Sequence, residues 1–436
     1  MVEMKKVEFN KPVLTGELSV PGDKSISHRA VMLGSIAKGK TSISGFLDGE
    51  DCLRTIAIFR QLGVSIERDG TNVEVESPGM HKWQQPAEDL YAGNSGTTAR
   101  LMLGILAGSQ ITSVLTGDEY LSKRPMNRVA LPLKAMGASI AGKLDSNLLP
   151  LTITGGKLSA IDYDMPIASA QVKSAILFAG LNAEGETAVS EQTISRDHTE
   201  RMLAQFGADI RQDGNKAIVK GGSVLHGTEV RVPGDISSAA FFMVAAAMTQ
   251  GSSVIFKDVG LNPTRTGILD VLKHMGATIE VLEQTDGIGE PYGTVKISHA
   301  SLQGTEISGE LIPRLIDELP VIALLATQAE GTTVIKDAEE LRVKETDRIA
   351  AVTTELRKIG AQIEETEDGM IIHGPTALTG GTLASYGDHR IGMMAAIAGL
   401  VTTGAITIED PSCINISYPG FFDDLEKLAV PTNVKG

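Results

Sequence analysis

The stretch RQLGVSI at residues 60–66 decides the fold, because it returns as KAMGASI (134–140), AQFGADI (204–210), KHMGATI (273–279) and RKIGAQI (357–363). A sixth, degenerate copy is LEKLAVPTN at 425–433. Each copy reads as the last turn of an amphipathic helix, a glycine in the left-handed cap position, and a strand with alternating apolar residues. Glycine suits that position because it tolerates a positive φ. Self-similarity of this kind predicts a repeat architecture.

A second apolar stretch lies upstream of each copy and is apolar on nearly every side. The six stretches are RAVMLGSIA, ARLMLGILAG, SAILFAGLNA, SAAFFMVAAAM, LPVIALLATQ and GMMAAIAGLV. Helices that are apolar all round are buried. Each repeat therefore predicts a βαβαββ module with a buried first helix and a more polar second helix that faces solvent. We expect an α/β (α+β) fold of two similar domains, each built from three modules around buried parallel helices.

The string VPGD occurs twice, at residues 20–23 and 232–235, three repeats apart. We interpret these turn-like segments as the two points where the chain crosses between the domains. One domain would comprise residues 1–20 plus 235–436, the other residues 21–234, and the crossings would form a two-strand hinge. We expect the domains to close on substrate.

The bulk composition is that of an ordinary globular protein, with 436 residues, 42% hydrophobic and 21% charged. A net charge of −15 argues against nucleic-acid or membrane binding, although a local cationic pocket can still hold a small anion. Cys52 and Cys413 have no metal-ligand spacing and suit a reducing compartment. The N-terminus has no apolar signal region, and no apolar run reaches about 18 residues. We expect a cytoplasmic protein.

Polar clusters open the predicted buried helices: GDKSISHR (22–29), GNSGTTAR (93–100), SAQVK (169–173), GDISS (234–238), DELP (317–320) and GDHR (387–390). Helix N-termini carry unpaired N–H groups and a partial positive charge, so they bind anions. Cations such as Lys24 and Arg29 oppose the helix dipole there unless an anion is bound. Taken singly, most clusters also have a structural explanation, such as a capped turn or a solvated loop. In RVKETDRI (342–349), for example, we interpret Thr346 as an N-cap with Asp347 in the first turn.

Together the strings closely resemble the 5-enolpyruvylshikimate-3-phosphate synthase family of enolpyruvyl transferases. The matching motifs are PGDKSISHRA, GNSGTT, SKRPM, SAQVKSA, DELPVIA, RVKETDRI, GDHRIGMM and SYPGFF. The resemblance implies an inside-out α/β barrel in each domain. It also implies transfer of the enolpyruvyl group of phosphoenolpyruvate to the 5-hydroxyl of shikimate 3-phosphate, through a tetrahedral intermediate that expels phosphate. The family uses no metal and no organic cofactor, and we expect a monomer acting in aromatic amino acid biosynthesis.

The resemblance also implies roles for individual residues. Lys24 would contribute to proton transfer, Asp317 would be the base on the 5-hydroxyl, Glu345 would exchange the methylene proton, and His389 would orient or relay. Shikimate 3-phosphate would be held by Lys24, Ser25, Arg29, Ser169, Ala170, Gln171, Arg196, Asp317 and Lys344. Phosphoenolpyruvate would be held by Lys24, Asn94, Gly96, Thr97, Arg124, Gln171, Arg348 and Arg390.

The chain departs from the common family pattern at two positions. Glu340 stands where many members have Asn, and Ile416 where many have a substrate-binding Lys. These departures are typical of the divergent bacterial branch, several members of which tolerate glyphosate. Gly96 nevertheless retains the small residue associated with sensitivity, so we expect glyphosate to compete with phosphoenolpyruvate.

Alternative functions remain open on the same scaffold. The UDP-N-acetylglucosamine enolpyruvyl transferases typically begin with AKN and carry a loop cysteine, whereas this chain has DKS and no cysteine between Cys52 and Cys413. A non-catalytic anion-binding protein would not require Lys24, Asp317 and Glu345 together. The acidic net charge disfavours an RNA-end-processing relative.

Overall fold

The computed structural model describes residues 3–285 and 289–431, which divide into two compact units. Unit 1 comprises Met1–Pro21, Pro233–Asp286 and Pro291–Gly436, and unit 2 comprises Gly22–Val232 with Gly287–Glu290. The divisions therefore fall inside the two VPGD segments, and the role of these segments as hinges stays a prediction. Nothing in the sequence indicated that Glu290 would group with unit 2, where its carboxylate oxygen lies 2.7 Å from His198 Nδ1.

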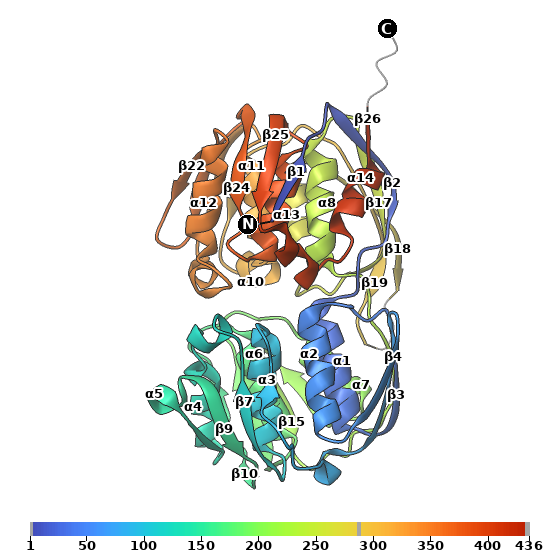
Figure 1. Cartoon of the computed structure of the whole chain (residues 1–436), viewed down its shortest axis with the longest axis vertical. Helices are drawn as coiled ribbons and strands as arrows, with labels where there is room; N and C mark the ends of the chain where they lie inside the picture. The colour runs from blue at the N-terminus through green and yellow to red at the C-terminus, as the bar shows by residue number, and fades with distance from the viewer. Residues whose placement is uncertain (1–2, 286–288, 432–436) are drawn as a thin grey trace. The chain divides into compact units, whose positions relative to one another are not determined.

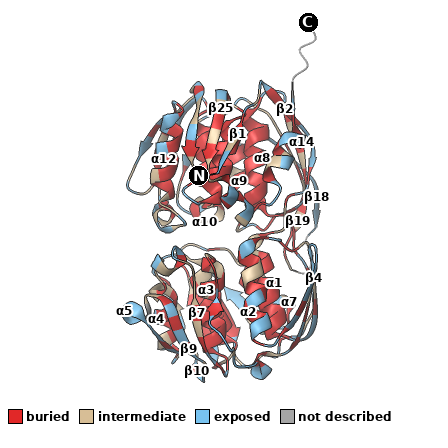
Figure 2. Cartoon of the chain, viewed as in Figure 1, coloured by how far each residue is buried: buried red, intermediate tan, exposed pale blue. Residues whose placement is uncertain are grey.

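Six buried helices form the centres of the two units (Figures 1 and 2). In unit 2 they are α1 (Lys24–Ile36), α3 (Gly96–Ala107) and α6 (Ala170–Gly180). In unit 1 they are α8 (Ile236–Met248), α11 (Leu319–Ala326) and α13 (His389–Ala398). Each of the six stretches that is apolar all round in the sequence thus lies in a buried helix, as predicted.

A second helix in each module is buried on one face only. These helices are α2 (Glu50–Gln61), α4 (Asn127–Ala135) and α7 (His198–Gln205) in unit 2, and α9 (Gly267–His274), α12 (Arg348–Lys358) and α14 (Phe421–Leu428) in unit 1. The five glycines that follow them in the recurring string have φ values of +86°, +95°, +91°, +95° and +98° (Gly63, Gly137, Gly207, Gly276 and Gly360). The predicted left-handed cap is therefore confirmed at every one of these positions.

The strands of unit 2 repeat one pattern, in which a parallel pair is extended by two antiparallel strands. The first sheet has the order β16 (Glu229–Arg231), β3 (Lys38–Ser44), β5 (Asn72–Pro78) and β4 (Ser65–Asp69). The second is β6 (Leu90–Tyr91), β7 (Thr112–Thr116), β9 (Leu148–Thr154) and β8 (Ser139–Gly142). The third is β11 (Asp162–Asp164), β13 (Glu186–Ser190), β15 (Lys216–Lys220) and β14 (Ile210–Asp213).

Unit 1 contains three comparable sheets, two of which use the N-terminal strands. The first runs β18 (Thr278–Thr285), β19 (Tyr292–Ser298), β17 (Ser253–Gly260), β2 (Pro12–Leu18) and β26 (Ala429–Pro431). The second runs β20 (Glu306–Ile307), β21 (Gly331–Ile335), β23 (Met370–Gly374) and β22 (Gln362–Glu365). In the third, β1 (Met4–Val7) pairs antiparallel with β25 (Thr402–Glu409), which pairs parallel with β24 (Leu378–Ala384). Among the described strands every sheet is open rather than a closed barrel.

The helices of unit 2 pack closely enough to require glycine at one crossing. A Cβ added at Gly104 of α3 would lie 2.0 Å from the carbonyl oxygen of Ala175 in α6, so any larger side chain would push the two helices apart. This contact brings the N-terminal ends of α3 and α6, which open on GNSGTTAR and SAQVK, side by side (Figure 1).

One local prediction from the sequence is wrong. Helix α12 begins at Arg348, and its N-cap is Asp347 rather than Thr346, with the Asp347 carboxylate accepting the N–H of Ala350 at 3.1 Å. Aspartate and threonine both favour this position, and the observed cap makes Arg348 the first residue of the helix instead of the second.

Candidate active site

The first helix of unit 2 presents Lys24 at its N-terminus. Asp23 caps α1 by accepting the N–H of Ile26 at 2.9 Å, so the helix starts at Lys24 and Ser25 lies in the first turn. The Lys24 ammonium lies 2.5 Å from the Asp51 carboxylate of α2, and the lysine side chain is 18% exposed. The cation is thus retained at a helix N-terminus by a neighbouring carboxylate, which offsets the unfavourable helix dipole.

Arg29 is buried, and its guanidinium makes hydrogen bonds within unit 2. Its three nitrogens donate to Thr199 Oγ1 at 2.7 Å, to the carbonyl oxygen of Ser25 at 3.0 Å and to Ser174 Oγ at 2.8 Å. Burial lowers the pKa of Arg29 to about 10. The structure therefore shows Arg29 holding α1 against α6 and α7, and its predicted contact with shikimate 3-phosphate stays a prediction.

The GNSGTT turn gathers polar groups from three segments. Ser95 caps α3, and Arg124 donates to Asn94 Oδ1 at 2.8 Å. Gln171 donates to Thr97 Oγ1 at 3.1 Å. The turn thus brings Asn94 and Thr97 together with Arg124 and Gln171, four residues that were predicted from three motifs.

Gly96 lies close to two cations beside this turn. A Cβ on Gly96 would lie 3.3 Å from Arg100 Nη1 and 3.4 Å from Arg124 Nη1, and Arg100 also donates to Gln171 Oε1 at 2.6 Å. Guanidinium groups beside an open helix N-terminus are well suited to bind a carboxylate or a phosphate.

The SAQ and SRDH segments meet at α6 and α7. Ser169 caps α6 and Ala170 is the first residue of that helix, while Arg196 precedes the first turn of α7, which begins at His198. Arg196 lies near enough to Arg29 for its charge to lower the pKa of that buried guanidinium.

Unit 1 places three carboxylates around one buried guanidinium. Arg348, 1% exposed, donates to Asp388 Oδ2 at 2.8 Å through Nε, to Asp317 Oδ1 at 3.0 Å and to Glu345 Oε2 at 2.6 Å. Burial alone would lower the pKa of Arg348, but these carboxylates raise it well above its ordinary value. Arg348 is buried within this charge-rich segment, whereas Glu345, three residues earlier, is exposed. The structure brings together Asp317, Asp388 and the pair Glu345 and Arg348, which lie in three different motifs.

The remaining predicted residues of unit 1 lie at neighbouring helix ends. Arg390, in the first turn of α13, donates to the carbonyl oxygen of Ser237 at 3.0 Å and lies 5.9 Å from the ring centroid of Phe241. His389 is the first residue of that helix and is buried. Lys344 is half-buried at the end of a 3₁₀ segment, Glu339–Val343, immediately before Glu345.

Three residues of these clusters received no role from the sequence. Asp51 pairs with Lys24, Arg100 bonds to Gln171, and Asp388 holds Arg348. Arg100 and Asp388 lie inside the GNSGTTAR and GDHR strings, so their charge at a helix N-terminus was an available signal. Asp51 lies in the following helix, where nothing local distinguishes it from a surface carboxylate.

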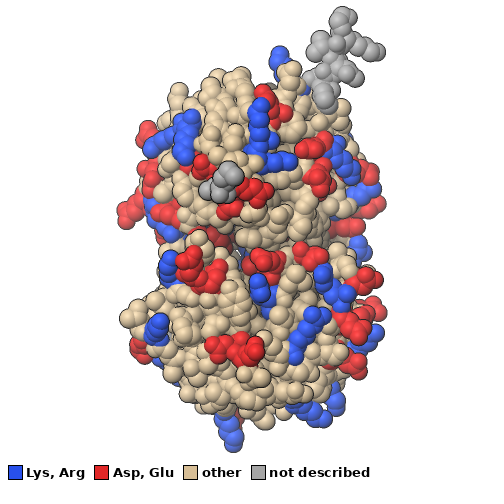
Figure 3. Space-filling model, viewed as in Figure 1, with Lys and Arg blue, Asp and Glu red and all other residues tan. Residues whose placement is uncertain are grey.

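The chemistry available in the two clusters is anion binding combined with proton transfer. Unit 2 offers a lysine, arginines and helix N-termini, whereas unit 1 offers carboxylates beside arginines. Elsewhere on the face shown in Figure 3, cationic and anionic side chains are interspersed. Among the described residues, no helix is long and apolar enough to cross a membrane.

A family model for "EPSP synthase (3-phosphoshikimate 1-carboxyvinyltransferase)" matches residues 10–425. The chain belongs to the EPSP synthase family. Over 417 residues it is 59% identical to a 3-phosphoshikimate 1-carboxyvinyltransferase of Bacillus licheniformis, a match that covers 95% of this chain and 97% of that protein. A Bacillus cereus protein of the same name is 58% identical over 416 residues, again covering 95% and 97%.

Solved structures agree with this family. An EPSP synthase from Acinetobacter baumannii superposes with a TM-score of 0.89 and 46% identity, covering 98% of each chain. The enolpyruvyl transferase NikO from Streptomyces tendae has a TM-score of 0.78 at 18% identity, covering 99% of this chain and 98% of that one, and shows the shared fold. The predicted α/β fold, the family and the shikimate-pathway transferase activity are therefore confirmed.

Proposed function

We propose that the two clusters serve one reaction, in which the 5-hydroxyl of shikimate 3-phosphate attacks phosphoenolpyruvate. The hydroxyl oxygen forms a bond to C2 while Asp317 takes its proton, and Glu345 delivers a proton to C3, which becomes a methyl group. In the second step Glu345 takes a proton back from C3, the bond between C2 and the phosphate oxygen breaks, and inorganic phosphate leaves. Lys24 stabilises the charge that develops on the phosphate and contributes a proton to it.

The Arg348 cluster is the single observation that carries this proposal. Asp317 and Glu345 share one guanidinium with Asp388, so this cation is surrounded by three carboxylates. An anionic substrate that binds Arg348 competes with these carboxylates for its N–H groups. A carboxylate that gives up its arginine is a stronger base. Binding of phosphoenolpyruvate would therefore prepare Asp317 and Glu345 for proton transfer.

We also propose the substrate contacts that the resemblance implies. Shikimate 3-phosphate is bound by Lys24, Ser25, Arg29, Ser169, Ala170, Gln171, Arg196, Asp317 and Lys344. Phosphoenolpyruvate is bound by Lys24, Asn94, Gly96, Thr97, Arg124, Gln171, Arg348 and Arg390. The contacts among Asn94, Thr97, Gln171 and Arg124 support the second set, because they already group these residues in unit 2.

Two conservative variants test the acid–base roles. Asp317→Asn and Glu345→Gln should each lower kcat by about 10²- to 10⁴-fold, since general acid–base groups contribute on that scale. The affinity for shikimate 3-phosphate, measured by calorimetry, should stay within about threefold in Glu345→Gln, because that residue acts on the methylene carbon. Glu339→Gln changes an exposed glutamate of the preceding 3₁₀ segment and is the matched control. Near-normal turnover of either variant would refute the role of that residue.

The acceptor is tested by phosphate release from phosphoenolpyruvate with shikimate 3-phosphate or with a UDP-amino sugar. Release only with the sugar would refute the proposal. Glyphosate, which carries a carboxylate and a phosphonate, should compete with phosphoenolpyruvate for the arginines. An inhibition pattern noncompetitive with phosphoenolpyruvate would contradict this.

We further propose that the protein acts as a cytoplasmic monomer. One chain contains every residue to which the resemblance assigns a role. Both cysteines are free and buried, which suits a reducing compartment. Sedimentation at micromolar concentration tests the monomer, and a dimer that is active only when associated would contradict it.

A further inference from the structure

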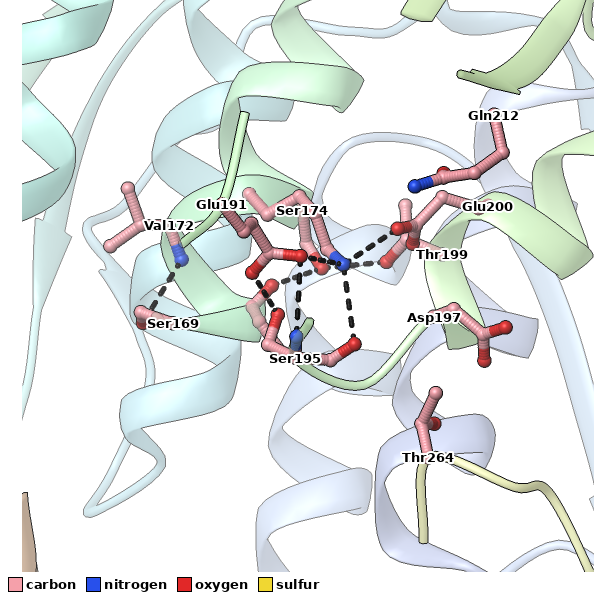
Figure 4. A network of polar contacts seen from close by, with 12 residues as sticks. Ser169, Val172, Ser174, Glu191, Ser195, Asp197, Thr199, Glu200, Gln212 and Thr264 are labelled. Carbon is pink, nitrogen blue, oxygen red and sulfur yellow. Dashed lines mark hydrogen bonds and ion pairs between the residues drawn. The ribbon is translucent and has the colours of Figure 1, made fainter. Parts of the chain in front are cut away.

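A buried ion cluster in unit 2 lies one turn along α6 from the SAQ segment. Lys173 is 2% exposed, and its Nζ lies 2.7 Å from Glu191 Oε2 and 2.7 Å from Glu200 Oε1. The same nitrogen donates to the carbonyl oxygen of Ser195 at 3.4 Å. Figure 4 shows these dashed lines converging on one nitrogen between Glu191, Ser195 and Glu200.

The cluster connects three segments of the chain. Glu191 follows β13 and also accepts hydrogen bonds from Ser195, from its N–H at 3.3 Å and from its hydroxyl group. Glu200 lies in the first turn of α7. Lys173 therefore fixes both the segment before Arg196 and the helix that follows it to α6.

A second set of contacts parallels the first. Ser174, the next residue of α6, lies 2.6 Å from Thr199 through its hydroxyl oxygen and donates to the carbonyl oxygen of Ala170 at 2.6 Å. The neutral contact between Ser174 and Thr199 joins the same two helices. The ionic contacts differ in that they also reach the 191–195 segment, which the Ser174 contacts leave untouched.

Burial of the ion cluster carries a large desolvation cost, so the cluster adds little net stability to the unit. One ammonium and two carboxylates are removed from water together, and apolar residues of similar volume often stabilise a protein at least as well. Burial alone would lower the pKa of Lys173, but the two carboxylates outweigh burial and raise it, so the ammonium stays charged. The ionic contacts instead fix the positions of the segments that they join, because charged hydrogen bonds hold their partners at set distances.

We infer that Lys173 is a positioning residue for shikimate 3-phosphate, which holds the start of α6 and Arg196 in the arrangement that binds this substrate. The inference rests on the proposed contacts of Ser169, Ala170, Gln171 and Arg196. Lys173 itself is buried among Glu191, Ser195 and Glu200, so it acts through the segments that it joins rather than on the substrate.

The test compares substrate affinities in the full-length enzyme. Lys173→Met should weaken shikimate 3-phosphate binding, measured by calorimetry, by about 10- to 100-fold, the range expected for a displacement of about 1 Å. The KM for shikimate 3-phosphate should rise in parallel and by more than the KM for phosphoenolpyruvate, which depends only on Gln171 of this segment. The kcat at saturation should stay within about threefold. A lower kcat with both KM values unchanged would indicate only a smaller folded fraction and would overturn the inference.

Two further variants guard against misfolding. Glu200→Ala removes one contact while Lys173 stays paired with Glu191, and it should weaken shikimate 3-phosphate binding by about tenfold. Glu200→Gln retains an oxygen acceptor and should bind within about threefold of the wild type. Lys216→Met, which breaks an exposed ion pair with Asp162 in the same unit, is the matched control and should change nothing. Equal binding by all these variants and the wild type would overturn the inference.

A variant of Arg196 separates this inference from the proposed site. If Arg196→Ala weakens shikimate 3-phosphate binding and Lys173→Met does not, the positioning role is wrong and the proposed site stands. If Arg196→Ala binds normally, the proposed contact of Arg196 is wrong and the inference fails with it. The expected result is that both single variants bind weakly and that Lys173→Met has a smaller effect once Arg196 has been replaced.

Discussion

Replacement of Asp388 by asparagine removes the negative charge that holds Arg348 and leaves the size of the side chain unchanged. Asp388 Oδ1 accepts the N–H of Arg390 at 2.8 Å and so caps α13, and asparagine retains this oxygen. The Oδ2 atom accepts Arg348 Nε at 2.8 Å. In Asp388→Asn an amide N–H₂ group takes the place of Oδ2 and faces this donor, so the hydrogen bond is lost and Arg348 must turn.

The magnitude follows from the partners that remain. Breaking a buried ion pair completely costs about 3–5 kcal/mol. Arg348 retains Asp317 at 3.0 Å and Glu345 at 2.6 Å, so the loss should approach that of one charged hydrogen bond, about 2 kcal/mol. For a unit of this size that corresponds to a fall in Tm of about 4–8 °C. The KM for phosphoenolpyruvate should rise by about tenfold, because the guanidinium proposed to bind it is displaced.

Calorimetric melting and steady-state kinetics at saturating shikimate 3-phosphate measure these effects. Asp347→Asn is the matched control, because Asp347 also caps a helix and pairs with an arginine, Arg342 at 2.8 Å, but near the surface. That control should lose at most about 1 kcal/mol and keep its KM. Equal losses in the two variants, or an unchanged KM for phosphoenolpyruvate in Asp388→Asn, would refute the reasoning.

Three further outcomes are expected. His28 is fully buried, and burial lowers its pKa from 6.5 to about 3, so only the unfolded chain gains this proton as pH falls below about 6.5. Between pH 7.5 and 5, the unfolding free energy of His28→Gln should therefore fall by about 2 kcal/mol less than that of the wild type, as measured by urea titrations. The variant His81→Gln, at an exposed position, is the control and should behave as the wild type does. Gly104→Ala should lower Tm, because overpacking lowers the unfolding free energy by about 1–3 kcal/mol or more. Gly156→Ala should melt near the temperature of the wild type, because a Cβ at Gly156 would have no atom within 4 Å. Gly96→Ala should raise the KM for phosphoenolpyruvate about tenfold with little change in Tm, since its Cβ would crowd two flexible guanidinium groups; an unchanged KM would contradict the proposed contact.

Much of the fold could be predicted because it follows from local rules. The recurring glycines require a positive φ, and that requirement depends only on the neighbouring turn. The six apolar stretches had to be buried wherever the chain placed them. The N-cap of α12 could not be decided between Thr346 and Asp347, since both residue types cap well and the sequence contains no further signal.

The candidate site was predictable as a set of residue types but not as a set of partners. Lys24, Arg124, Gln171, Asp317, Glu345 and Arg348 all stand at motif positions that the sequence marks. Which carboxylate pairs with Lys24, or how Asp388 shares Arg348, depends on contacts between residues far apart in the chain. Such contacts carry no periodic signal.

The sequence by itself determined the six modules, the buried helices and the family, because hydrophobic periodicity, turn residues and motif strings are local properties. Only the tertiary structure decided that Arg29 is bound internally, that three carboxylates share Arg348, and that Lys173 joins α6 to α7. The physical reason is that hydrogen bonding and charge depend on distances of a few ångströms. Those distances are set when separate modules pack together.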